Sequence, residues 1–212
     1  IAIRIICANT PVIDDFPRLR SEIEGKIPEW IGSTLLPVKA VWVAGDERVY
    51  GNLIALSSDT PPDWERLMQV REELTRIHWV CRVMYAFGGK VREKEITHIT
   101  PTFLREETAD QVRMADRIVH EEFWARWLLE YISQTPVATI PVGFETPWQR
   151  SVVIRPFKTI DFKTGDPVIP GTPEMPDVVL EIIVKRILTE MPGISRVLYD
   201  ITPKPPGTTE LE

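Results

Sequence analysis

The pattern of apolar positions occurs twice along this chain, and each occurrence predicts the same succession of elements. Each copy begins with two strand-like runs, continues through an amphipathic helix with a proline-rich entry, and closes with a third strand-like run. The corresponding runs are LPVKAVWV and IPVGFETP, YGNLIAL and RSVVIRPF, and CRVMYAF and SRVLYDI, which start at Leu36 and Ile140, Tyr50 and Arg150, and Cys81 and Ser195. The pattern predicts a β-β-α-β unit that is present twice.

Caps and apolar stripes predict the helix of each unit. The first helix begins after Thr60, with prolines at its entry and acidic residues in its first turn. The second begins near Pro176 and ends at Pro192, a helix breaker. Both helices should lie on the sheet through their stripes, which are Trp64, Leu67, Met68 and Leu74 in the first and Val179, Ile183 and Ile187 in the second.

A longer helix is predicted between the two units, over residues 105–134. Apolar residues recur there at helical spacing, and aromatic residues widen the surface. We expect so broad an apolar surface to lie between the units or to cover the second one. The face consists of Val112, Ala115, Val119 and Phe123, widened by Ile118, Trp124, Trp127, Leu128 and Tyr131.

These elements predict an α+β fold, because strands and helices do not alternate one by one as in a parallel doubly wound sheet. We expect two β-β-α-β repeats that form two-layer sandwiches with antiparallel sheets, joined by the long helix. The predicted domains are residues 1–96, an N-terminal strand with the first unit, and residues 97–212, the long helix with the second unit and its tail. The chain starts with isoleucine inside a strand-like run, so we expect it to be part of a longer polypeptide.

The C-terminal stretch RVLYDITPKPPGTTE passes from a strand-like run into a proline segment. Pro203, Pro205 and Pro206 fix φ and remove backbone donors, so we expect an extended, stiff strap that presents Lys204. A point cation in a defined place suits a phosphate or carboxylate partner. A solvated lysine in a loose terminus is the more common alternative.

Composition narrows the classes of partner. The chain has 212 residues, 43% of them hydrophobic, which is enough for a core. Its net charge of −6 disfavours broad attraction to nucleic acid or an anionic membrane, and no apolar run is long enough to span a bilayer. Cys7 and Cys81 lie in apolar runs, which favours free thiols in a reducing compartment and therefore a cytoplasmic location.

Signatures of catalysis are sparse. The three histidines lie in unrelated contexts, and no Cys/His/Asp spacing is typical of a zinc or calcium site. The chain has no phosphate-binding loop, no G-x-G-x-x-G after a strand and no G-x-S-x-G elbow. We therefore expect no catalytic residue, no metal and no cofactor in this part of the polypeptide.

Four polar residues at the ends of elements are candidates for ligand binding. Asp46 and Arg48 flank a tight hairpin turn, which they either shape or use to reach a ligand. Gln134 follows the long helix, and its amide either caps that helix or meets a ligand. Glu210 lies in the tail, where terminal disorder is the default expectation.

Four motifs together resemble the C-terminal part of GMP synthase, the glutamine-hydrolysing ligase that aminates XMP. They are RVLYDITPKPPGTTE, TIDFKTGDP from Thr159, THITPTFL from Thr97, and the GDER turn from Gly45. The doubled unit is similar to the longer variety of that enzyme, in which the dimerisation subdomain occurs twice. The first copy, about residues 36–90, would be the inserted one. The family pattern ends in Glu-Trp-Glu, from which Leu211 departs.

This resemblance implies a dimerisation domain that completes an XMP site, with ATP, Mg and glutamine handled by the amidotransferase and ATP pyrophosphatase domains elsewhere. By motif, it implies that Lys204 contacts the XMP phosphate, and that Glu210, Gln134, Asp46 and Arg48 contact XMP as well. It also implies contacts with other domains of the same polypeptide, and either a homodimer or a monomer with internally paired repeats.

Two other functions fit small α+β units. A KH-like nucleic-acid module requires a G-x-x-G loop and basic flanks, which this acidic chain lacks. A stand-alone protein-interaction module is the other alternative.

Overall fold

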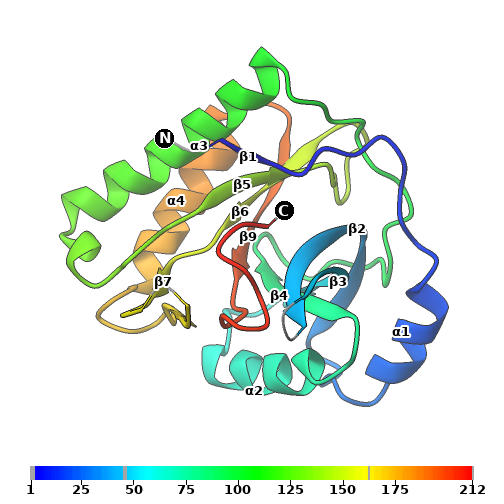
Figure 1. Cartoon of the computed structure of the whole chain (residues 1–212). Helices are drawn as coiled ribbons and strands as arrows, with labels where there is room; N and C mark the ends of the chain where they lie inside the picture. The colour runs from blue at the N-terminus through cyan, green and yellow to red at the C-terminus, as the bar shows by residue number, and fades with distance from the viewer. Residues whose placement is uncertain (1–2, 45–46, 162, 212) are drawn as a thin grey trace.

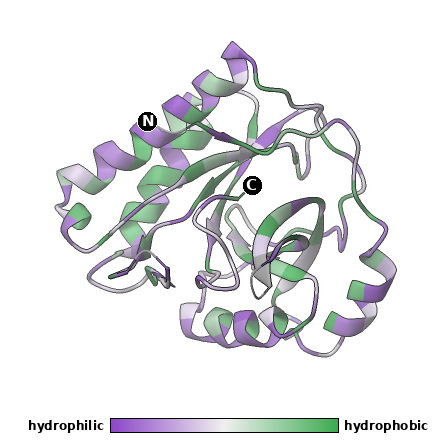
Figure 2. Cartoon of the chain, in the orientation of Figure 1, coloured by the Kyte–Doolittle hydropathy of each residue, from purple (hydrophilic) through white to green (hydrophobic). Residues whose placement is uncertain are grey.

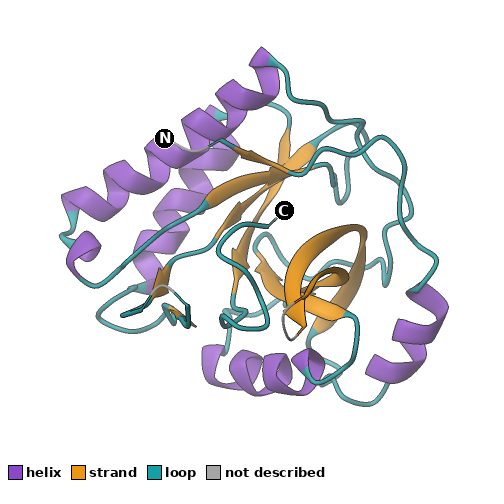
Figure 3. Cartoon of the chain, viewed as in Figure 1, coloured by secondary structure: helices purple, strands orange, loops and turns teal. Residues whose placement is uncertain are grey.

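The computed structural model describes residues 3–44, 47–161 and 163–211, without the side chains of Val43, Ala44 and Arg48. Seven strands form one curled sheet, and helices cover one of its faces (Figures 1 and 3). The elements are β1 (Arg4–Ile5), α1 (Phe16–Ile23), β2 (Gly32–Ala44), β3 (Glu47–Ser57), α2 (Trp64–Thr75), β4 (Val80–Ala86), α3 (Glu106–Ala125), a 3-10 helix (Leu128–Glu130), β5 (Val137–Ile140), β6 (Arg150–Ile154), β7 (Phe157–Lys158), β8 (Asp166–Pro167), α4 (Asp177–Glu190) and β9 (Ile194–Asp200).

Both units contribute to the same sheet. Its strand order is β1-β5-β6-β9-β4-β3-β2, so the first unit (β2, β3, α2, β4) continues the second (β5, β6, α4, β9). The α+β class is confirmed, but the expected antiparallel sheets are replaced by a mixed one, since β4 is parallel to β3 and β9 is parallel to β6. The reason is the helix before each third strand, which returns the chain to the end of the sheet where the second strand began.

The units meet where β4 pairs antiparallel with β9, in a register that is symmetric about two tyrosines. Tyr85 lies opposite Tyr199, its counterpart in the repeated sequence. On either side, Met84 pairs with Asp200 and Ala86 pairs with Leu198. In the repeat Met84 corresponds to Leu198 and Ala86 to Asp200, so exchanging the units turns one pair into the other. An approximate twofold axis therefore passes between the tyrosines, as it would between two copies of one subunit.

Both faces of the sheet are buried. The apolar stripes of α2, α3 and α4, visible as green bands in Figure 2, pack with one face of the sheet in a single cluster. The opposite face has its own cluster, in which Leu53, Met84 and Leu198 lie with Ile96 and Leu211. Loops and the C-terminal end of the chain, rather than helices, cover this second face.

The helix between the units is shorter than predicted. It ends at Ala125, and Trp127 adopts a left-handed conformation with φ of 60° before the 3-10 turn. Such a φ cannot continue an α-helix. The helix packs on α4, β5 and β1, so it covers the second unit, which was one of the two expected placements.

Candidate functional site

The tail, residues 201–211, folds back over the sheet after β9. The expectation of an extended strap is wrong, because the chain turns at Pro205 and Pro206 and the Gly207 amide donates to the Pro203 carbonyl at 3.1 Å. Beyond the turn Gly207 pairs with Trp42 in β2. The tail therefore lies along an edge strand of the sheet (Figure 1).

Lys204 is held by its backbone and its side chain. Its amide and carbonyl exchange hydrogen bonds with Gly165, at 2.7 and 2.8 Å. Its ammonium group donates to Thr209 Oγ1 at 2.7 Å, and the residue is half-buried. A solvated lysine in a loose terminus is therefore the wrong interpretation, and the cation occupies a defined place.

Glu210 is anchored at both ends of the residue. Its carboxylate forms an ion pair with Arg4 of β1, in which Nη2 donates to Oε1 at 3.0 Å. Its carbonyl accepts from Arg82 Nη2 at 2.6 Å. Since β1 and β2 are the two outer strands of the sheet, the tail bridges both edges. The default expectation of terminal disorder is not met here.

Gln134 lies on the other side of a small ribbon from Lys204. The helix ends nine residues earlier in sequence, so Gln134 does not cap it. Its backbone pairs with Phe157 of β7, β7 pairs with β8, and Gly165 beside β8 pairs with Lys204. The Gln134 side chain is exposed. The ribbon thus ties two of the predicted residues to one region of the surface.

The other predicted pair belongs to the β2–β3 hairpin. Asp46 lies outside the described residues, and so does the side chain of Arg48, whose backbone pairs with Val43. The tail runs next to the hairpin end, because Trp42 pairs with Gly207 and the Val41 amide donates to the Leu211 carbonyl at 3.1 Å. The hairpin end of the first unit therefore approaches the tail of the second.

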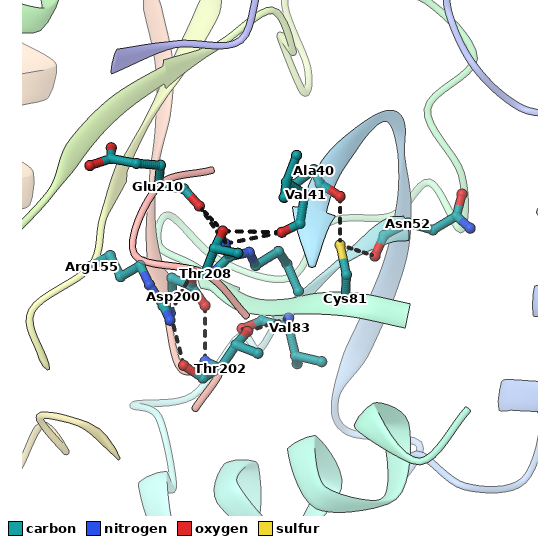
Figure 4. A network of polar contacts seen from close by, with 11 residues as sticks. Ala40, Val41, Asn52, Cys81, Val83, Arg155, Asp200, Thr202, Thr208 and Glu210 are labelled. Carbon is teal, nitrogen blue, oxygen red and sulfur yellow. Dashed lines mark hydrogen bonds and ion pairs between the residues drawn. The ribbon is translucent and has the colours of Figure 1, made fainter. Parts of the chain in front are cut away.

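A buried charge cluster lies under the tail, and no sequence motif marks its residues. Asp200 pairs with Arg155 at 2.8 Å and with Arg82 at 3.3 Å, and all three residues are almost completely buried. Burial lowers the pKa of the Arg155 guanidinium to about 10. Figure 4 shows this network reaching Thr208 and Glu210 of the tail. The sequence contains one signal for this cluster: Arg82 lies inside the apolar strand β4, and Arg155 directly follows the apolar strand β6.

The cavity beside the tail is small. A cavity of about 220 Å³ lies beside Arg4, Ala138 and Glu210, whereas ligand pockets usually have roughly 300–1,000 Å³. Within residues 3–44, 47–161 and 163–211, no group of His, Cys, Asp and Glu could hold a metal ion. Nor is any helix in that part of the chain long and apolar enough to cross a membrane.

Comparison with known proteins shows the family. The family model for the GMP synthase C terminal domain matches residues 131–211. A glutamine-hydrolyzing GMP synthase of Dictyostelium discoideum is 35% identical over an alignment 254 positions long, which covers 99% of this chain and 35% of that protein. The chain belongs to the GMP synthase family.

Two further relatives give the extent of the match. A probable glutamine-hydrolyzing GMP synthase of Caenorhabditis elegans is 38% identical over 200 residues, covering 86% of this chain and 27% of that protein. A GMP synthase of Alcanivorax borkumensis is 38% identical over 115 residues, or 51% of this chain and 21% of that protein. The chain thus spans about a third or less of the length of these GMP synthases.

Proposed function

We propose that this chain is the dimerisation part of a GMP synthase, and that it completes the XMP site of that enzyme without catalysing the reaction alone. The reaction would be the ATP-dependent conversion of XMP and glutamine to GMP in purine synthesis. The observation that carries the proposal is the anchored tail, in a chain whose second half matches the GMP synthase C-terminal domain.

The tail would act by presenting its charges to XMP. Lys204 would meet the phosphate, since an ammonium group makes a charge-assisted hydrogen bond to such an anion without a basic surface. Gln134, across the ribbon, would donate or accept at another edge of the ligand. Asp46 and Arg48 would contact XMP from the first unit. Glu210 would either contact XMP or hold Arg4 in place, as its ion pair suggests.

The remaining parts of the reaction would be supplied by other domains of the same polypeptide. In this proposal ATP, Mg and glutamine are handled there, as the resemblance to GMP synthases implies. A reducing, cytoplasmic setting, as expected for two cysteines in apolar runs, is part of this proposal. The two units would be the dimerisation subdomain and its inserted copy, within domains 1–96 and 97–212. The Alcanivorax relative, aligned over about half of the chain, agrees with a shorter form that has one unit.

Kinetics of the full-length protein test this function. Lys204→Ala should raise the KM for XMP by roughly 10- to 100-fold, because one charge-assisted hydrogen bond is lost. The KM values for ATP and glutamine should remain unchanged. Lys185→Ala, at an exposed position on α4, is the matched control. An unchanged KM for XMP in the Lys204 variant would contradict the proposal.

Calorimetry on the 212-residue chain tests whether its site is partial. We expect weak or undetectable heat on titration with XMP, because in this proposal other domains of the polypeptide supply the rest of the site and the cavity beside Glu210 is only about 220 Å³. Tight, saturable binding would show that the site is complete without other domains.

A further inference from the structure

Two arginines occupy equivalent positions in the repeated units, and each reaches across the twofold axis into the other unit. Arg196 of β9 donates through Nη1 to the carbonyls of Phe87 and Gly89, at 3.0 and 2.7 Å. These residues follow β4, the last strand of the first unit. Arg82 of β4 reaches the corresponding region of the second unit, which is the tail.

The contacts of Arg82 with the tail are close, and their guanidinium side is buried. Its Nη2 donates to Thr208 Oγ1 at 2.8 Å and to the Glu210 carbonyl at 2.6 Å. The Arg82 side chain has no exposed surface. Hydrogen bonds from a charged donor are stronger than neutral ones, and a low-dielectric surrounding on the donor side strengthens them further. Arg82 therefore fixes the tail on both sides of Thr209, the residue that receives the Lys204 ammonium group.

Charge pairing does not explain why Arg82 is there. Asp200 already has a partner in Arg155, which lies nearer to it than Arg82 does. A second buried cation beside one carboxylate leaves an excess positive charge, and burial of such a charge is unfavourable unless other acceptors compensate. The nearest compensating acceptors are the two tail oxygens, whereas the Val41 carbonyl of β2 lies farther away, at 3.4 Å. The tail and the guanidinium group therefore depend on each other.

The backbone of the tail is fitted to this arrangement at Gly207. A Cβ atom added there would lie 2.6 Å from Arg82 Nη1 and 3.2 Å from Arg155 Nη2. Both guanidinium groups are enclosed and hydrogen-bonded, so they have little room to move away. Only glycine lets the tail approach the cluster this closely.

We propose that Arg82, from the first unit, is the positioning residue for the tail and sets the place from which Lys204 and Glu210 act. The part of this inference that concerns XMP rests on the proposed function. The first unit then contributes to the site through a buried side chain, which holds the tail of the second unit in place.

Hydrogen exchange on the 212-residue chain tests the positioning directly. In Arg82→Gln, the amides of Gly207 and Val41, which bond to Pro203 and Leu211, should exchange roughly tenfold faster or more, since a charge-assisted anchor is lost. Gly207→Ala should have the same effect while Arg82, Asp200 and Arg155 remain, so the test does not depend on one variant folding. Arg196→Gln is the matched control and should leave both amides unchanged.

Kinetics of the full-length protein separate this inference from the function on which it rests. Arg82→Gln and Gly207→Ala should raise the KM for XMP roughly tenfold with the KM for ATP unchanged, and Arg82→Lys should restore part of the loss. Faster tail exchange with an unchanged KM for XMP would support the role of Arg82 and overturn the XMP function of the tail. Unchanged exchange in both variants, or equal rises in the KM for XMP and ATP, would overturn the inference.

Discussion

One buried carboxylate, that of Asp200, holds two buried guanidinium groups. Asp200 accepts from Arg155, from Arg82 and, through Oδ1, from the Thr202 amide at 2.9 Å. The carboxylate therefore compensates two guanidinium groups, whereas each guanidinium group is compensated by one carboxylate and by carbonyls. Loss of the carboxylate should consequently be more damaging than loss of one arginine.

Urea unfolding of the 212-residue chain measures this asymmetry. Asp200→Asn should lower the free energy of unfolding by about 3–5 kcal/mol, because two buried cations lose their counter-charge. Arg155→Met should cost less, since the Arg82–Asp200 pair remains and one excess charge disappears. Equal losses in the two variants would contradict this account of the cluster.

The two thiols should differ sharply in reactivity. Burial raises the pKa of the Cys81 thiol to about 12, and Cys7 is exposed. At pH 8 roughly one Cys81 in ten thousand is then a thiolate, the reactive form. A thiol-reactive disulfide reagent should titrate one cysteine rapidly in the folded chain and the second only after denaturation. Cys7→Ser should abolish the rapid phase, and a rapid phase of two equivalents would exclude a buried Cys81.

At the residue scale, the sequence indicated candidate ligand contacts such as Lys204, but it did not indicate the buried arginines under the tail. Lys204 was identified because prolines around it are unusual in a tail, and it is indeed held in place. Arg82 and Arg155 were missed, because their neighbours form an apolar run in which a charge is easily assigned to the exposed side of a strand. Only the tertiary structure shows that both strand faces are covered.

At the scale of elements, a carboxylate at the N-terminus of α1 adds polar contacts to the apolar packing of this helix on the first unit. Asp15 accepts from Lys39 of β2 at 2.9 Å and from Asn52 of β3 at 3.3 Å. The hydrogen bond from Lys39 is the main cause of the lowered pKa of Asp15. Because the folded pKa is depressed, the contribution is present above the usual value of 3.8 and is lost as the pH falls through the folded pKa.

Asp15→Asn should therefore destabilise the chain by about 1 kcal/mol at pH 7, which is the usual contribution of one partly exposed hydrogen bond to a charged group. The difference from the unmodified chain should persist at pH 5 and shrink below 3.8. Urea unfolding at several pH values measures it, with Asp14→Asn, at an exposed neighbour, as the control. A deficit that does not change with pH would mean that the charge of Asp15 is unimportant.

Periodicity predicted the elements better than their pairing. The two β-β-α-β units follow from repeated apolar runs, whereas the mixed sheet depends on how each helix returns the chain, which no local pattern records. The helix over 105–134 was predicted too long because Trp124 and Trp127 continue its apolar spacing. Both are about three-quarters exposed, and spacing alone cannot distinguish an exposed aromatic residue from a buried one.

At the scale of the whole molecule, the two units satisfy each other's strand edges. The last strand of each unit pairs with that of the other, as in a two-subunit assembly with a twofold axis. Of the outer strands, β1 has two residues, and β2 is covered by the tail and by residues 94–96. Short or covered edges do not favour further strand pairing.

We therefore expect the whole chain to be a monomer of 24.3 kDa in light scattering. A fragment of residues 97–212 lacks β4 and leaves the edge of β9 unpaired, so at the same concentration it should dimerise through β9. In that dimer Tyr199 should lie opposite Tyr199 of the other copy, since Tyr85 takes that position in the whole chain. Amide exchange along β9 should accordingly slow with increasing fragment concentration. A whole chain that dimerises, or a folded fragment that stays monomeric with β9 exposed, would show that the inserted unit does not replace a second subunit.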